Sequence, residues 1–498
     1  MVRTVIAPLL RPAVCLIIGI TVGRYVSWPI SYVYAVFILL LLIAGVCSFV
    51  KKAINTSLVL ELACIALGYL LCLHQQTKFK VQWPTETCNW QAVVTSEPVV
   101  HGKTIWMDAL LTTTGQKIQL RLMHDKQSSR LTIGNGIVFE AVVKPLSAQG
   151  SYRTFQETRG YVGETIVWRN RWQREDISLD NISTIDRCRI FFMSVRHEIL
   201  KQISANIKEQ DDYAILVAMT LGDRTAVSRE QKEAYAIAGT SHLLALSGLH
   251  LGIIYMLLAR LFRKHRRQLF SQLLTVVSTW AFVLLVGMPS SVVRAATMIS
   301  IYAFVSLLGR SKTPINTLAL TAIIMLGCNP YALFDVGFQL SFAAVLAILL
   351  FVPIFDALVS CPSYLSSIKS LTAVTVAAQI GTAPLVAFHF GRFSPWFLLS
   401  NYVSIPLVTV ILYLMLLLLL TGFWPVLQAA FSIVPATLAS WLNGWTSWVA
   451  SLPLASIDGL HPSMLQVTML YVLIGCSYWL IRYHINHSIR KTPQKREK

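Results

Sequence analysis

The sequence predicts a polytopic α-helical membrane protein, with about nine to twelve transmembrane helices and an inserted extracytoplasmic small β-barrel domain. Of its 498 residues, 55% are hydrophobic and only 13% are charged, and the mean hydropathy is +0.60. A soluble protein of this length does not need so much apolar surface. The apolar runs are interrupted once, between residues 75 and 205, where charges are common and apolar residues alternate.

The N-terminal region, residues 1–74, is predicted to form transmembrane helices. Its apolar segments are close to the length that spans a bilayer, although the third is short. No Ala-x-Ala-like cleavage site follows the first segment, which is therefore interpreted as a membrane helix rather than a cleaved signal. The segments are Val5–Val22, Val33–Val50 and Leu58–Leu73.

Residues 75–190 are predicted to form a β domain. Short alternating segments are separated by glycine-containing turns. Five strands at this spacing are typical of a small barrel such as an OB-fold, and a plain β-sandwich would leave a similar pattern. The predicted strands are 90–94, 105–111, 118–122, 137–143 and 161–168.

An amphipathic helix is expected at 191–210. Its apolar residues recur at spacings of three and four, which is the period of one helix face. A helix lying on the membrane surface and a helix packed in a bundle both fit this pattern. The apolar positions are Phe192, Val195, Ile199, Ile203 and Ile207.

Residues 211–482 are predicted to form a second transmembrane domain, followed by a basic tail at 483–498. Several of its apolar segments contain proline or glycine, so their boundaries are soft. The candidate spans are Ala234–Leu261, Leu269–Val286, Ser291–Leu308, Thr317–Cys328, Val336–Ile354, Leu371–Phe390, Phe397–Leu420, Val426–Val449 and Met464–Ile481.

The net charge of +19 predicts an orientation. Basic clusters beside the apolar runs indicate cytoplasmic loops, and nucleic-acid binding is a second interpretation of the same charge. Counting crossings from an external β domain places 263–267, 310–312 and the tail on the cytoplasmic side, with both termini cytoplasmic.

Polar residues within the second apolar region indicate a pathway. The segment 239–252 places histidines, hydroxyls and glycines at the start of an apolar run, where they are unfavourable unless they face protein or water. Helix caps and interhelical hydrogen bonds are the alternative for any single residue. The candidate pathway residues are Asp223, Arg224, His242, Ser247, His250, Arg294, Asp335, Gln339, Gln379 and His389.

His242 and His250 also suggest catalysis or metal binding. No nearby carboxylate completes a triad, no third ligand is evident, and the flanking pattern of a nucleophile elbow is missing. The nine cysteines contain no CxxC pair. The sequence therefore predicts no catalytic residue, no metal site and no cofactor, and we expect a protein that is not an enzyme.

Several ordered segments resemble the ComEC-type competence proteins, a family of bacterial DNA-uptake channels. The first runs from Ala218 through Arg224 and continues from Ala238 to His250. The later ones are Ser290–Ala296, Asp335–Phe342, and Ala383–Leu385 with His389–Gly391. Membrane helices followed by an extracytoplasmic OB-like domain match the family plan, which favours the OB-fold over the sandwich.

This resemblance implies a channel that imports single-stranded DNA across the bacterial cytoplasmic (inner) membrane during natural transformation. It also implies partners: the DNA strand, the lipid bilayer, and other competence proteins, namely a DNA receptor, a helicase and a separate nuclease. Family members often carry a C-terminal metallo-β-lactamase-like domain. No His-x-His-x-Asp-His motif occurs in this chain, so we expect that domain to be lacking.

Two further expectations concern the β domain. Aromatic side chains could stack on the bases of a bound strand, or could belong to the barrel core. An extracytoplasmic location would allow Cys88 and Cys188 to form a disulfide, stabilising the domain by roughly 4–5 kcal/mol. The candidate aromatics are Trp90, Trp106, Tyr161 and Trp168.

Other function classes remain open at this point. A small-solute or ion transporter would use Asp335, Arg294 and His242 as a buried coupling site. A membrane-embedded enzyme would use His242 and His250. The number of subunits is not determined by the sequence, and a homo-oligomer is compatible with it.

Overall fold

The computed structural model is mostly helical. It describes residues 7–26, 28–49, 53–147, 150–178, 180, 182–207, 209–262, 268–307, 313–421 and 425–491. The chain divides into two compact units, and each is discontinuous in sequence. The first comprises Met1–Gln202 and Leu258–Asp335, and the second comprises Ile203–Leu257 and Val336–Lys498.

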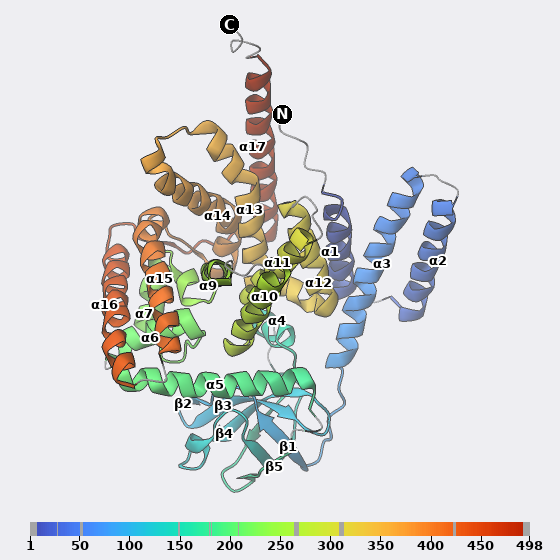
Figure 1. The fold of residues 1–498 in the computed structure, drawn as a ribbon. Helices are drawn as coiled ribbons and strands as arrows, with labels where there is room; N and C mark the ends of the chain where they lie inside the picture. Colours follow the sequence, from blue (N-terminus) through green and yellow to red (C-terminus); the bar gives the residue numbers. More distant parts are fainter. Residues whose placement is uncertain are drawn as a thin grey trace. The chain divides into compact units, whose positions relative to one another are not determined.

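Three helices begin the first unit, and α1 packs closely on α3 (Figure 1). Glycines allow this contact, because a Cβ at Gly19 would collide with the carbonyl group of Ile65, and one at Gly68 with that of Leu16. Small residues let helices in a membrane approach in this way. The helices are α1 (Leu10–Tyr25), α2 (Ile30–Phe49) and α3 (Ala53–Phe79).

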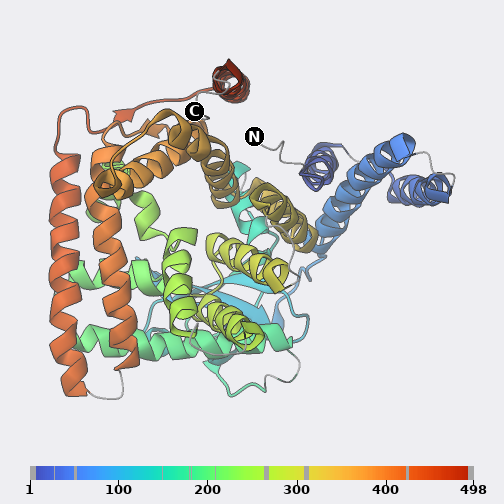
Figure 2. The same ribbon diagram turned by 45° about the horizontal axis from the view of Figure 1, so that its top comes forward.

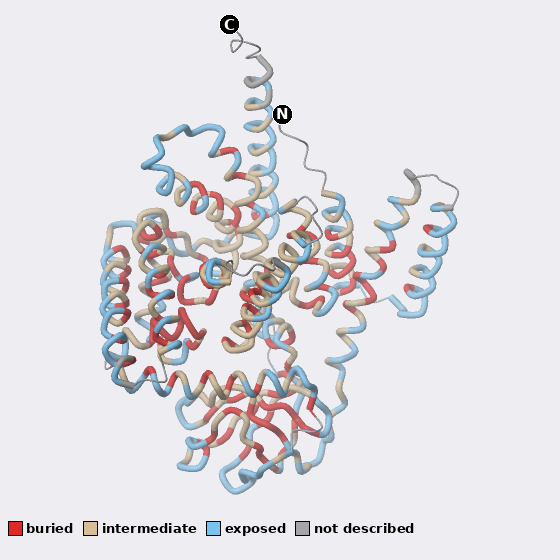
Figure 3. Tube along the Cα trace, viewed as in Figure 1, coloured by how far each residue is buried: buried red, intermediate tan, exposed pale blue. Residues whose placement is uncertain are grey.

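A mixed β-sheet follows, and its hydrogen-bonded order is β6-β4-β3-β1-β5-β7, with β2 paired to β3. All five strands predicted from alternation are confirmed, and β2 and β7 are additional short strands. Along β4 the buried residues alternate with half-buried ones, and the buried side forms an apolar core (Figure 3). The strands are β1 (Cys88–Val94), β2 (Val99–His101), β3 (Thr104–Leu111), β4 (Lys117–Met123), β5 (Gly136–Ala141), β6 (Tyr161–Val167) and β7 (Trp172–Arg174), with the short helices η1 (Ser128–Arg130) and α4 (Gly150–Thr158) between them.

Helix α5 (Thr184–Asn206) is longer than the predicted amphipathic helix and begins earlier. Its buried face differs from the predicted one. Ile190 and Met193 pack on Val93 and Leu110 of the sheet, whereas the predicted Phe192 is only half-buried. Figure 1 shows this helix lying along the sheet. Packing against the β domain, rather than contact with lipid, therefore determines which residues the first half of α5 buries.

Three more helices complete the first unit after the chain returns to it at Leu258. Helices α10 and α11 pack on each other, as do α11 and α12, and the short η2 contacts α3, α4 and α12. These elements are α10 (Gln268–Leu285), α11 (Ser290–Leu307), α12 (Pro314–Cys328) and η2 (Pro330–Phe334).

In the second unit, α13 packs along α14, and α15 packs along α16 (Figure 2). The single predicted span Ala234–Leu261 is wrong. The chain forms three separate helices there, because Gly239 adopts a φ of 77° and residues 245–247 are not helical. The elements are α6 (Gln210–Leu221), α7 (Arg229–Ile237), α8 (Ser241–Leu244), α9 (Gly248–Phe262), α13 (Val336–Leu358), η3 (Ser363–Leu365), α14 (Ser366–Phe390), β8 (Arg392–Phe393), α15 (Phe397–Leu420), α16 (Pro425–Ala450), β9 (Ile457–Asp458) and α17 (Met464–Lys491).

Among the described residues, seven helices are long and apolar enough to cross a membrane, and three apolar helices are shorter. The predicted number was about nine to twelve; the difference comes from helices such as α9 and α12, which are apolar but have only 15 residues. The basic clusters 51–52, 263–267, 310–312 and 492–498, which carry the predicted orientation, lie outside the described residues.

Candidate functional site

The predicted pathway residues of the second unit begin at a sharp turn after α6. Gly222 caps this helix with a left-handed φ of 75°. Asp223 is buried, and its Oδ1 accepts hydrogen bonds from the backbone N–H of Thr225 at 2.9 Å and from its hydroxyl at 2.7 Å. Arg224 is exposed. Asp223 thus shapes the turn through a local side-chain bond, as aspartates commonly do.

The polar segment 239–252 follows α7. A Cβ at Gly239 would lie 3.0 Å from Cβ of Ser394, so glycine suits this position both for its positive φ and for its close neighbour. The adjacent Thr240 is fully buried, and its hydroxyl donates to the carbonyl of Tyr235 at 3.4 Å. His242 in α8 is exposed and lies within electrostatic range of His250.

Ser247 and His250 touch at the start of α9. The Ser247 hydroxyl lies 2.8 Å from Nδ1 of His250, and the Ser247 backbone N–H donates to the same nitrogen at 3.3 Å. The imidazole is fully buried, and its Nε2 has no hydrogen-bond partner among the described residues. The structure therefore brings these two predicted residues together.

A second pair of predicted residues meets between α13 and α14. Oε1 of Gln339 lies 3.0 Å from Nε2 of His389. The helices approach closely, because a Cβ at Gly381 would lie 2.6 Å from the carbonyl oxygen of Ala343. The carbonyl of Gly381 accepts from the Tyr471 hydroxyl at 2.8 Å. Gln379 is half-buried on α14 and forms neither of these contacts.

An ion-pair cluster beside this segment escaped prediction. Arg392, in the short strand β8, pairs with Glu233 of α7 at 2.7 Å and also with Asp458 of β9. The hydrogen bond from Glu233 and those involving Asp458 raise the pKa of Arg392. The hydroxyl of Ser456 and the guanidinium of Arg392 lower the pKa of Asp458. These partners are far apart in sequence, so no local pattern indicates them.

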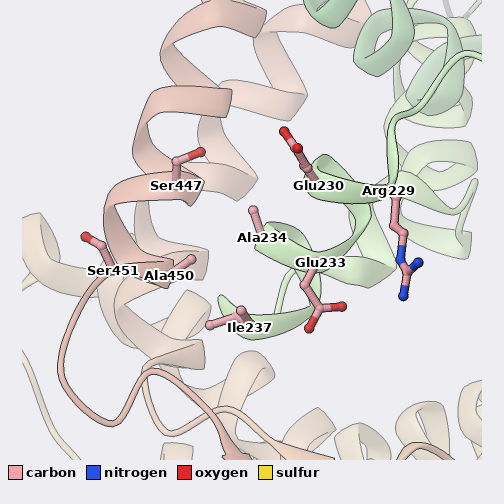
Figure 4. A pocket seen from close by; sticks show the side chains of 8 residues that line it. All are labelled: Arg229, Glu230, Glu233, Ala234, Ile237, Ser447, Ala450 and Ser451. Atoms are coloured by element: carbon pink, nitrogen blue, oxygen red, sulfur yellow. The ribbon is translucent and has the colours of Figure 1, made fainter.

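Glu233 also lines an open groove between α7 and α16 (Figure 4). Glu230 stands beside it on α7, and Ser447 and Ser451 face the groove from α16. None of the groove's residues is among the predicted pathway residues.

The same two helices are joined to α6 by a polar chain. The Tyr235 hydroxyl donates to Asn443 at 3.0 Å, and the Asn443 amide donates to Asp212 at 3.1 Å. Burial raises the pKa of Asp212, although the bond from Asn443 opposes that shift. This chain fixes the packing of α6, α7 and α16.

In the first unit, Arg294 and Asp335 are the predicted pathway residues. Arg294 lies in α11 and is only 2% exposed. Asp335 follows η2, is half-buried, and lies close enough to favour the charge of Arg294. A buried arginine within reach of a carboxylate is the arrangement expected for intramembrane charges.

A buried charge cluster, which we call the Arg24 cluster, joins the β domain to the helices of the first unit. Glu157 of α4, with a side chain only 6% exposed, pairs with Arg24 at 2.9 Å and with Arg153 at 3.0 Å. The Arg24 guanidinium lies 4.7 Å from the ring centre of Tyr331. The amide of Asn329 donates to the carbonyl of Thr158 at 3.1 Å. Sequence reasoning missed this cluster.

The four candidate DNA-binding aromatics fall into two groups. Trp90 packs against the sheet core and donates to the carbonyl of Ala141, and Tyr161 is buried with its hydroxyl 2.6 Å from Asp108. Trp106 is half-buried on β3 with the Arg121 guanidinium 4.2 Å from its ring, while Trp168 is 65% exposed.

Tyr161 belongs to a small buried network. Its hydroxyl shares Asp108 with Lys117, whose ammonium lies 3.0 Å from that carboxylate. Burial raises the pKa of Tyr161, and Asp108 raises it further. Burial also lowers the pKa of Lys117, against the pull of Asp108. This environment makes Tyr161 a structural residue.

The predicted disulfide between Cys88 and Cys188 does not form in the structure, where both residues are free thiols. Cys88 opens β1 opposite Ala141, and its thiol contacts the carbonyl of Glu86 at 3.6 Å. Cys188 is exposed on α5. Among the described residues, no group of three or more histidine, cysteine or acidic side chains is arranged to hold a metal ion.

Comparison with known proteins identifies the second half of the chain. The model of the competence protein family matches residues 219–483, just over half of the sequence. The chain belongs to the competence protein family. The predicted resemblance to ComEC-type proteins is thereby confirmed, and the matched segment contains every predicted pathway residue from Asp223 to His389. With seven apolar helices long enough to cross a bilayer, this competence protein is a multi-pass membrane protein.

Individual relatives agree with this assignment. ComE operon protein 3 of Bacillus subtilis (strain 168) is 28% identical over 313 residues, which cover 61% of this chain and 38% of that protein. An uncharacterised Aquifex aeolicus protein is 28% identical over 216 residues, covering 43% of this chain and 49% of the relative. Recombination protein 2 of Haemophilus influenzae is 25% identical over 233 residues, covering 44% and 30%. The matches thus span less than half of each relative's length. No solved structure matches the chain significantly.

Proposed function

We propose that this competence protein is a channel that imports single-stranded DNA across the bacterial cytoplasmic membrane during natural transformation. Family membership supports a role in competence, and it covers the region in which the helices carry polar residues. The observation that supports transport most directly is the broken segment 239–250, where non-helical backbone and polar side chains interrupt an apolar sequence. Irregular backbone at membrane depth is tolerated where it lines a wet path or is buried in protein.

The β domain would be the first part to meet the strand. We assign it an OB-like barrel. The parallel pairing of β4 with β6, the pairing of β1 with both β3 and β5, and a bridge between Lys144 and Glu164 support this assignment. OB-folds commonly hold single strands on aromatic side chains beside a basic groove.

Within this domain, Trp106 and Trp168 suit such a role better than Trp90 and Tyr161. Trp106 is partly accessible, is covered by Arg121 at 4.2 Å and lies 4.9 Å from the His101 ring. Trp168 is largely exposed. The arginine would meet the phosphates and the rings would stack on bases.

The remaining parts of the proposal follow from the family. The protein would have both termini in the cytoplasm, would act without catalysis or a cofactor, and would work with a DNA receptor, a helicase and a separate nuclease. Assembly into a homo-oligomer is compatible with this scheme.

Transformation frequency tests the function. In a naturally competent host, deletion of the gene is expected to abolish transformation by added DNA while surface-bound DNA persists. The full chain supplied from a second locus should restore transformants. An unchanged frequency in the deletion strain would refute the proposed function.

A small-solute or ion transporter is the alternative. The buried Arg294 beside Asp335 is the observation that favours it, since such pairs serve as coupling sites in transporters. The full chain in liposomes would then catalyse coupled solute flux independent of DNA. Abolished transformation without such flux would leave DNA import as the better account.

A further inference from the structure

The first turn of α9 carries a histidine that caps its own helix. Ser247 precedes the helix, and its backbone N–H donates to Nδ1 of His250, three residues further on, at 3.3 Å. A side chain at this position that reaches back to the cap residue resembles the second half of a capping box, normally made by glutamate or glutamine. The Ser247 hydroxyl approaches the same nitrogen at 2.8 Å.

This contact determines where the imidazole carries its proton. A backbone N–H is only ever a donor, so the nitrogen that receives it has no proton of its own. The neutral ring therefore carries its hydrogen on Nε2. A doubly protonated ring would direct Nδ1–H at the Ser247 N–H, so the cap holds His250 neutral.

Nε2–H of His250 is thus an oriented donor without an acceptor. The residue is fully buried, and no acceptor lies within hydrogen-bond distance of this nitrogen among the described residues. Buried donors are nearly always paired, and an unpaired one is an exception that requires an explanation. The cap does not supply one, because it uses only Nδ1.

Backbone amides lie on the same turn. The first intrahelical bond runs from Leu251 N–H to the Ser247 carbonyl, so the amides of Gly248 and Leu249 precede the helical ladder. Both residues are exposed. One turn further along, a Cβ added at Gly252 would meet nothing within 4 Å, so there is open space beside this part of the helix.

We infer that the first turn of α9 binds a phosphate group, with the amides of Gly248 and Leu249 and Nε2–H of His250 as its donors. Amides at a helix N-terminus favour anions, and the neutral imidazole supplies a directional bond. As to the source of the phosphate, this inference rests on the proposed function, in which the ligand is a phosphodiester of the imported strand. Phospholipid headgroups and free phosphate present the same oxygens.

Two substitutions separate the cap from the donor. Asparagine can place its carbonyl oxygen near Nδ1, which retains the cap but lacks the distal donor. Glutamine can place its NH₂ near Nε2, which retains the donor. We therefore compare His250→Asn with His250→Gln in the full chain, purified in a maltoside detergent that contains no phosphate.

The probe is a short fluorescent single-stranded oligonucleotide, and its Kd is measured by anisotropy beside the thermal unfolding of each variant. His250→Asn should bind about tenfold more weakly while unfolding like the unchanged chain, since a hydrogen bond to a charged group contributes roughly 1.5–3 kcal/mol. His250→Gln should bind within about threefold of the unchanged chain, a change below 1 kcal/mol. Unchanged affinity in His250→Asn would overturn the inference.

A second variant covers the case in which His250→Asn fails to fold. Gly248→Pro removes one amide donor at the first helical position, where proline is well accepted. It should weaken oligonucleotide binding by a few-fold without unfolding, and full affinity in that folded variant would also overturn the inference.

Further probes distinguish failure of the site from failure of the function. If the unchanged chain binds inorganic phosphate in calorimetry with the same dependence on His250 but binds no oligonucleotide, the site stands and DNA import falls. Binding of the oligonucleotide with equal affinity by all variants would leave DNA import intact and remove the site. Displacement of bound phosphate by phosphatidylglycerol, but not by the oligonucleotide, would reject the strand as the source.

Discussion

The two units of this competence protein treat their buried polar groups differently. In the first unit, Glu157 is surrounded by partners: Arg24 at 2.9 Å, Arg153 at 3.0 Å, and an aromatic ring beneath Arg24. In the second, the Nε2–H of His250 is equally buried and has no acceptor among the described residues. A satisfied buried charge indicates a structural joint, whereas an unfilled oriented donor indicates a place where a ligand completes the structure.

The largest effect should come from breaking the satisfied cluster. Glu157→Ala leaves Arg24 and Arg153 without their shared carboxylate and should lower the free energy of unfolding by about 3 kcal/mol, as for other broken buried pairs. Denaturant unfolding of the purified chain measures it. Glu140→Ala is the matched control, because that glutamate is exposed on β5. Equal effects of the two changes would show that the Arg24 cluster is not a structural joint.

The close approach of α13 and α14 should be the next most sensitive feature. Gly381→Ala places a methyl group 2.6 Å from both the Ala343 carbonyl oxygen and the Ala347 methyl. Overpacking of this kind costs about 1–3 kcal/mol. Gly475→Ala in α17, where a Cβ meets nothing within 4 Å, should have little effect on thermal unfolding in detergent. Similar melting temperatures for both variants would contradict the observed packing.

Exposed aromatics of the β domain should affect binding but not stability. Trp168→Ala is expected to weaken single-stranded oligonucleotide binding by about tenfold, because one stacked base contributes roughly 1–3 kcal/mol. The unfolding temperature should not change, since Trp168 is 65% exposed. Trp90→Ala is the contrasting variant and should destabilise the sheet core. Undiminished binding by folded Trp168→Ala would exclude this residue from the strand's path.

The smallest effect concerns acid stability at Arg392. The pKa of Asp458 is lowered in the folded state by Ser456 and Arg392, so its contribution is present above the ordinary carboxylate value of 3.8 and is lost as the pH falls through the folded value. Because Asp458 is 56% exposed, the contribution should stay below about 1 kcal/mol. Asp458→Asn should therefore lower stability at neutral pH and converge with the unchanged chain below about pH 3. Parallel stability curves down to that pH would contradict this.

Local patterns predicted the elements well but not their long-range partners. Alternation along 118–122 correctly predicted a strand, since each buried residue there contributes to one face of the sheet. The buried face of α5 was predicted wrongly, because the sheet against which it packs, and not its own periodicity, selects Ile190 and Met193.

The candidate site shows the same limit. Its polar residues were recognisable because they interrupt apolar runs, but the roles within it depend on contacts that sequence does not display. The bond from Ser247 to His250 spans three residues, yet only the structure shows which ring nitrogen it occupies. Arg24 and Glu157 are separated by 133 positions, so nothing in the sequence connects them.

Strand-specific DNA uptake tests the central claim most directly. Competent cells with and without the gene would receive duplex DNA labelled on one strand or the other, and label resistant to external nuclease would be measured. The account predicts internalised label as single strands in cells carrying the gene and none in the deletion strain, with surface-bound label unchanged. Equal internalised label in both strains would contradict the claim that this competence protein is the DNA channel.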